Sequence, residues 1–121
     1  MTKHILVIDD EADIRDLLAR YFVSCGYRVT PVSLATEAQE TVLRDPPDLI
    51  ISDLQLEDMD GLEMIAKLKT GLPDVPVILL TGVLFDPHVV RENLSKKVSC
   101  YLEKTSSLAS IMAAVRRLLG E

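Results

Sequence analysis

Short apolar runs alternate with longer amphipathic segments along this chain. The runs have the length and composition of β-strands, whereas the segments between them repeat apolar residues at three- and four-residue steps, which is typical of helices with one buried face. The strands are expected at 5–8, 27–32, 48–53, 75–80 and 99–102. The helices are expected at about 14–25, 35–43, 61–70, 86–95 and 108–119, and the one at 86–95 has a thin apolar face.

Strict alternation of strands and helices predicts a parallel sheet with right-handed crossovers. The runs at 5–8, 48–53 and 75–80 are almost continuously apolar, as expected for strands covered by helices on both sheet faces. The run at 27–32 is mixed and the run at 99–102 is short, so both are expected at the edges. We therefore predict one α/β domain over residues 1–121, a flavodoxin-like three-layer sandwich whose doubly wound five-stranded parallel sheet has the order 2-1-3-4-5.

Composition argues against a nucleic-acid-binding domain and a membrane-spanning chain. The chain has 121 residues, two cysteines and a net charge of −6, which argues against direct binding of nucleic acid by this domain. Cys25 and Cys100 stand in apolar patterns and are expected in the core, whereas His4 and His88 are expected at the surface. No apolar stretch is long enough for a signal peptide or a membrane span, so the expected location is the cytoplasm.

Polar side chains stand at the ends of the predicted strands, where ligands bind in open α/β sheets. They are Asp9, Asp10, Asp53, Thr81 and Lys104. Four of them have an ordinary explanation on their own: Asp10 could cap a helix, Asp53 could start a turn, Thr81 could belong to a loop, and Lys104 could be a surface lysine. Together, three adjacent carboxylates would repel one another unless a cation lay among them, and oxygen ligands of this kind suit Mg²⁺.

The residues around this site restrict its chemistry. Neither histidine is expected near it, no glycine-rich phosphate loop follows the first strand, and Asp9-Asp10-Glu11 is not the Asp-x-Asp arrangement of hydrolases with an aspartate nucleophile. What remains is a carboxylate that could accept a phosphoryl group, with little to support repeated turnover.

These residues give the chain a resemblance to the receiver (response-regulator) domains of bacterial two-component signalling. The resemblance covers nearly the whole length and includes Met59-Asp60-Gly61; the matching stretches are Ile5–Glu11, Pro47–Glu63, Val75–Gly82 and Tyr101–Lys104. It implies that Asp53 accepts a phosphoryl group from a phosphohistidine. It also implies that Lys104 pairs with the phosphoryl oxygens, that Thr81 donates a hydrogen bond to them, and that Tyr101 moves from an exposed to a buried rotamer.

The resemblance further implies a Mg²⁺ site. Asp10 and Asp53 would bind the ion directly together with the backbone carbonyl of Gln55, and Asp9 would act mainly through a metal-bound water. Gln55 and Val83 occupy positions that set how long the phosphoaspartate survives in this family.

The implied function is a phosphorylation-dependent signalling switch that catalyses its own phosphorylation and slow dephosphorylation and is no multi-turnover enzyme. Its implied partners are a histidine kinase or histidine phosphotransfer domain, a downstream output domain or protein, and a second copy in a phosphorylation-linked homodimer. The face made by the fourth helix, fifth strand and final helix would carry the signal. A pseudo-receiver that works without phosphate, and a small Mg²⁺-dependent phosphatase, remain the alternatives.

Three departures from the family pattern affect these expectations. Thr105 replaces the proline that usually follows the site lysine in a cis peptide, so we predict a trans bond there. Glu57 replaces another usual proline and is expected to weaken phosphoryl binding by adding negative charge near the pocket. Lys97-Val98-Ser99 replaces a usual Gly-Ala pair and predicts a different turn before the fifth strand.

Overall fold

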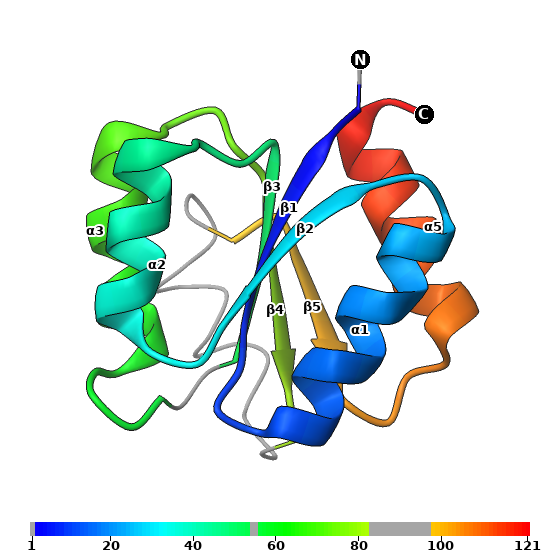
Figure 1. Cartoon of the computed structure of the whole chain (residues 1–121), viewed down its shortest axis with the longest axis horizontal. Coiled ribbons are helices and arrows are strands. Elements are labelled where there is room, and N and C mark those ends of the chain that lie inside the picture. Colours follow the sequence, from blue (N-terminus) through cyan, green and yellow to red (C-terminus); the bar gives the residue numbers. More distant parts are fainter. Residues whose placement is uncertain (1, 54–55, 83–97) are drawn as a thin grey trace.

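A computed structural model describes residues 2–53, 56–82 and 98–121 of the chain (Figure 1). The elements in these residues follow the predicted order, with boundaries that differ from the expected ones by one or two residues in most of them. The strands are β1 (His4–Ile8), β2 (Arg28–Val32), β3 (Leu49–Ser52), β4 (Val77–Thr81) and β5 (Cys100–Glu103). The helices are α1 (Ala12–Ser24), α2 (Ala35–Arg44), α3 (Gly61–Gly71) and α5 (Leu108–Leu119). The helix expected at 86–95 lies outside the described residues.

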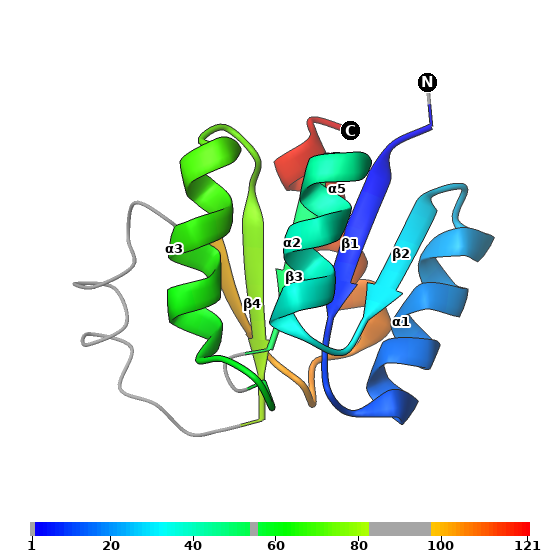
Figure 2. The same ribbon diagram turned by 60° about the vertical axis from the view of Figure 1, so that its left-hand side comes forward.

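The five strands form one parallel sheet in the order β2-β1-β3-β4-β5, which confirms the predicted topology. Helices α1 and α5 cover one face of the sheet, and α2 and α3 cover the other (Figures 1 and 2). The two strands expected at the edges, β2 and β5, are the edge strands. Within the described ranges, every helix is too short or too polar to cross a lipid bilayer.

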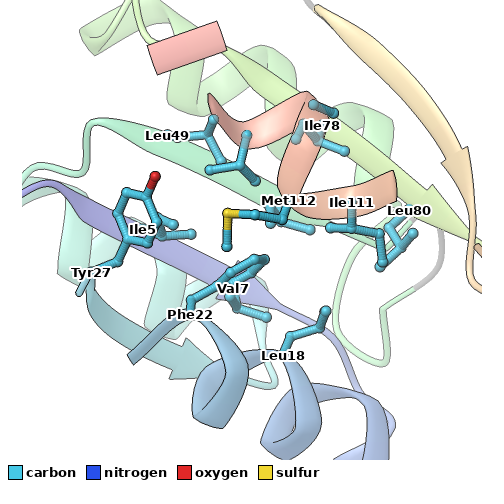
Figure 3. Packing of buried hydrophobic residues seen from close by; sticks show 13 residues of the cluster. Ile5, Val7, Leu18, Phe22, Tyr27, Leu49, Ile78, Leu80, Ile111 and Met112 are labelled. Atoms are coloured by element: carbon cyan, nitrogen blue, oxygen red, sulfur yellow. The ribbon is translucent and has the colours of Figure 1, made fainter. Parts of the chain in front are cut away.

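Alternation along the strands divides the buried side chains between two cores. In β1, Leu6 and Ile8 join the cluster under α2 and α3, whereas Ile5 and Val7 join the cluster under α1 and α5. In the second cluster, Phe22 of α1 and Met112 of α5 lie over the sheet (Figure 3). Because both faces of β1 are covered, its five residues are all buried, and this interior strand fixes the position of Asp9, the residue that follows it.

Three side chains differ from the predictions made for them. His4 is fully buried rather than at the surface, because its Nε2 lies 2.7 Å from Oγ1 of Thr30 and its backbone N–H donates to the carboxylate of Asp48. Cys25 is exposed, because α1 ends at Ser24 and the cysteine lies beyond its buried face. Leu17 is half-exposed, so the apolar stripe of α1 is narrower than its sequence indicates.

Candidate functional site

The register of the sheet brings the ends of β1 and β3 together. Ile8 pairs with Ser52, and the backbone N–H of Asp53 donates to the carbonyl of Ile8 over 2.9 Å. Asp9 and Asp53 therefore leave neighbouring strands at the same level, at the edge toward which the arrowheads of β4 and β5 point (Figure 1). Both side chains are buried, with only 2% of Asp9 and 6% of Asp53 exposed.

Four carboxylates meet at this edge. Asp9, Asp10, Glu11 and Asp53 each offer one oxygen, and these oxygens all lie within 4.8 Å of one another. Asp10 and Glu11 are exposed, so the cluster opens to solvent on one side. An all-oxygen donor set with room for several waters fits Mg²⁺, which keeps much of its hydration when bound to proteins.

Burial and neighbouring donors act on the carboxyl group of Asp9 in opposite directions. Burial raises the pKa of its carboxyl group, while the backbone N–H of Glu11, which donates to Oδ1 over 2.9 Å, and the ammonium of Lys104 act in the opposite direction. The pKa of Asp9 remains above its ordinary value, because the loss of hydration of the carboxylate outweighs the stabilisation by these contacts.

Lys104 supplies the positive charge of the site. It follows β5, and its Nζ lies 2.7 Å from Glu11, 3.0 Å from Asp53 and 3.1 Å from Asp9. Only 9% of its side chain is exposed. Burial by itself would lower the pKa of the ammonium, but the hydrogen bonds to Glu11, Asp53 and Asp9 outweigh it and raise the pKa, so Lys104 is charged at neutral pH.

The segment after β4 also reaches the lysine. A Cβ placed on Gly82 would lie 3.7 Å from Cδ of Lys104, so the residue after Thr81 lies beside the lysine stem. Thr81 is the last residue of β4 and pairs with Glu103 of β5. Tyr101 is half-buried on β5, pairs with Leu79 and packs against the core under α2 and α3.

The structure thus brings Asp9, Asp10, Asp53 and Lys104 together at the predicted edge. Gln55 and Val83 lie outside the described residues, so their parts in the site stay predictions, as do the roles of the Thr81 hydroxyl and of Tyr101. Sequence reasoning missed Glu11, although it stands directly after Asp9-Asp10 and is the nearest partner of Lys104.

The structure tests two expectations for residues beside the site: that Asp10 caps the first helix, and that the peptide bond before Thr105 is trans. The suggestion that Asp10 caps the first helix is wrong, because the N-cap residue of α1 is Glu11, whose side chain makes no capping hydrogen bond. The peptide bond between Lys104 and Thr105 is trans, as predicted from the missing proline. Ser106 donates its N–H to the carbonyl of Glu103 over 2.9 Å, so the site lysine lies within a tight turn over residues 103–106.

A further acidic residue, Asp58, lies on the segment between β3 and α3 and contacts the start of α2. Its carboxylate accepts the backbone N–H groups of Ala35 over 2.9 Å and Thr36 over 3.2 Å. These hydrogen bonds join residues 56–60, which precede α3, to the start of α2, and both helices cover the same face of the sheet (Figure 1). Nothing in the local sequence around Asp58 indicates this contact.

Comparison with known proteins places this geometry in a family. The family model described as the response regulator receiver domain matches residues 5–116. The chain is 34% identical over 120 residues to the response regulator protein VraR of Staphylococcus aureus, covering 97% of this chain and 56% of that protein. It is 32% identical over 122 residues to the response regulator MprA of Mycobacterium leprae, covering 95% of this chain and 50% of the relative. The chain therefore spans about half the length of these curated relatives.

Solved structures show the same fold. A CheY-like receiver domain protein from Methanospirillum hungatei superposes with a TM-score of 0.92 at 23% identity, covering 99% of this chain and 95% of the other. NtrX from Brucella abortus superposes with a TM-score of 0.89 at 26% identity, covering 99% of this chain and 28% of that protein. With the acidic cluster and its lysine at the same edge of the sheet, the chain belongs to the family of response regulator receiver domains of two-component systems.

Proposed function

We propose that this domain, spanning residues 1–121, is a phosphorylation-dependent switch that accepts a phosphoryl group on Asp53 from a histidine kinase or a histidine phosphotransfer domain. The observation that carries the proposal is the contact of one nearly buried ammonium, that of Lys104, with the two buried carboxylates of Asp9 and Asp53. The cation holds a nucleophilic carboxylate in a fixed place at the open edge of the sheet.

The proposed reaction is a single displacement at phosphorus. A carboxylate oxygen of Asp53 forms the new P–O bond, the bond from phosphorus to the imidazole nitrogen of the donor breaks, and the electron pair leaves with that imidazole. The product is an acyl phosphate, with more negative charge and more hydrogen-bond acceptors than the carboxylate it replaces. Lys104, 3.0 Å from Asp53, is placed to donate to the new phosphoryl oxygens.

Mg²⁺, when bound, would offset the charge of the carboxylates and of the phosphoryl oxygens. Asp10 and Asp53 would hold it directly, Asp9 would act through a water, and the backbone carbonyl of Gln55 would complete the protein ligands, as the family resemblance implies. The acidic cluster supports this assignment, because its oxygens lie within 4.8 Å of one another and two of its carboxylates face solvent.

Lys104 would also start the response to phosphorylation. In the present arrangement its ammonium is shared among three carboxylates, so a phosphoryl group on Asp53 would draw it away from Glu11 and Asp9. We propose that Thr81 donates a hydrogen bond to the same phosphoryl group and that Tyr101 follows it inward. A two-state change of this kind would alter the face that includes β5 and α5 and so reach a downstream output domain or protein, or a second copy of the domain.

Incubation with Mg²⁺ and a small labelled acyl phosphate tests the proposal against both alternatives. A switch gains one phosphoryl group per chain and loses it slowly, a pseudo-receiver gains none, and a phosphatase releases many phosphates per chain without lasting label. Replacing Gln55 by Ala tests the expected control of lifetime, since an unchanged decay rate would exclude a part for this side chain. Glu57→Pro tests the expected charge effect, since equal phosphorylation rates would contradict it.

A further inference from the structure

The first turn of α2 receives its cap from a distant part of the chain. The N-cap residue is Leu34, whose hydrocarbon side chain cannot accept a hydrogen bond, although the first N–H groups of any helix lack partners within the helix. Asp58 supplies the missing acceptors, with one carboxylate oxygen on the N–H of Ala35 and the other on the N–H of Thr36. A carboxylate at this end also interacts favourably with the helix dipole.

The position of Asp58 makes this cap more than a local feature. It lies five residues after Asp53, the proposed phosphoacceptor, and three residues before the start of α3. On the other side of the contact, Ala35 and Ala38 are fully buried, so the start of α2 is fixed against the sheet. The carboxylate thus connects the segment that follows the phosphoacceptor to a rigid part of the core.

We propose that Asp58 is a positioning residue that anchors this segment to α2, so that Mg²⁺ binding at the acidic cluster and the first turn of α2 stabilise each other. The inference rests on the proposed function, because it assigns the cluster to Mg²⁺. In this proposal Asp58 is no ligand of the ion, because it lies outside the group of four carboxylates, and it would act only through the residues that it holds.

The charge state of Asp58 is consistent with this anchor. The N–H of Ala35, and after it that of Thr36, lower the pKa of the Asp58 carboxyl group, as expected for hydrogen bonds that favour its charged form. Energetic coupling of this type is reciprocal: if the anchor strengthens Mg²⁺ binding, bound Mg²⁺ must strengthen the anchor by the same factor.

The first test compares Mg²⁺ affinity, measured by calorimetric titration, in the parent protein and in Asp58→Ala. We expect the dissociation constant to rise about five- to tenfold in the variant. Glu57→Gln is the matched control for charge, because it removes one negative charge at the preceding position, which is also exposed, and leaves the bonds to α2 intact. An equal loss of affinity in the two variants would overturn the inference, since charge alone would then explain it.

A second variant separates anchoring from the stability of α2. Leu34 has the extended backbone conformation of an N-cap residue, so Leu34→Ser can cap α2 locally. In the double variant Asp58→Ala/Leu34→Ser we expect the urea midpoint to recover while Mg²⁺ affinity stays low. Recovery of both would overturn the inference, because Asp58 would then act only by stabilising the helix.

Amide hydrogen exchange provides a readout that is independent of phosphorylation. In the parent, Mg²⁺ should slow hydrogen exchange at the N–H groups of Ala35 and Thr36 about five- to tenfold. In Asp58→Ala, the exchange rates of these two groups should be the same with and without Mg²⁺. A parent protein that binds no Mg²⁺ would overturn the proposed function and this inference with it. A parent that binds Mg²⁺ with the same affinity as Asp58→Ala would overturn this inference alone.

Discussion

The Nζ atom of Lys104 lies 3.0 Å from Oδ2 of Asp53, although 51 positions separate the two residues in the chain. The contact forms because β3 and β5 both end at the same edge of a parallel sheet, with β4 between them. It means that the proposed nucleophile and the cation proposed to receive the phosphoryl oxygens are already paired before any donor binds. Preorganisation of this kind spares the protein a rearrangement at the moment of reaction.

The ammonium of Lys104 should stabilise the protein strongly when Mg²⁺ is absent. In Lys104→Met the buried carboxylates of Asp9 and Asp53 lose their shared partner, and we expect the free energy of unfolding to fall by about 3 kcal/mol. Urea denaturation at neutral pH measures the loss. Added Mg²⁺ should reduce the difference in the free energy of unfolding between the parent and Lys104→Met, because the ion then offsets the charges of the same carboxylates. An equal difference with and without Mg²⁺ would contradict the proposed ion site.

Glu11 should contribute far less, although it is the nearest partner of Lys104. Its side chain is 60% exposed, and exposed ion pairs contribute about 0–1 kcal/mol. Glu11→Gln should therefore change the free energy of unfolding by less than about 1 kcal/mol in the same urea experiment. A loss as large as that of Lys104→Met would show that Glu11, rather than Asp9 and Asp53, provides most of the pairing energy.

Asp9 should reveal a conflict between stability and ion binding. Its pKa is raised mainly by burial, so its charged form is held at a cost, and Asp9→Asn should stabilise the protein without Mg²⁺ by about 1 kcal/mol. The same change removes an oxygen charge from the cluster and should weaken Mg²⁺ binding. Thermal unfolding and calorimetric titration test both parts, and a destabilised variant with unchanged Mg²⁺ affinity would contradict both.

The cap supplied by Asp58 should depend on pH in a defined direction. Because hydrogen bonds from Ala35 and Thr36 lower its pKa below 3.8, its contribution to stability is present above that value and is lost as the pH falls below it. Asp58→Asn cannot titrate and has one acceptor oxygen in place of the two that Ala35 and Thr36 use, so at about pH 6 it should be less stable than the parent by about 1 kcal/mol. The difference in stability between the two proteins should shrink as the pH falls below 3.8, whereas a constant difference would exclude the carboxylate charge as its source.

The fold could be predicted from the sequence because its signals are local. The continuous runs ending at Ile8 and Ser52 mark strands covered on both faces, and the shorter or mixed runs mark the edges. Once the strand order is known, parallel strands must bring Asp9, Asp53 and Lys104 to one edge, so most of the candidate site follows from topology.

What the sequence did not predict depends on contacts between distant segments. His4 looks like a polar residue at the start of a strand, and only its hydrogen bond to Thr30 on the neighbouring strand explains its burial. The capping of α2 by Asp58 joins residues 23 positions apart, and the pairing of Glu11 with Lys104 joins residues 93 positions apart. No periodicity or spacing along the chain encodes such pairs.

Esterification of the side chain at position 53 is the claim on which the whole account depends. Its most direct test is peptide mass spectrometry after exposure to Mg²⁺ and a labelled phosphodonor, with the parent protein and Asp53→Asn treated side by side. The account predicts one phosphoryl group on the peptide that contains Asp53 in the parent and none on the variant. Equal labelling of the two proteins would contradict it.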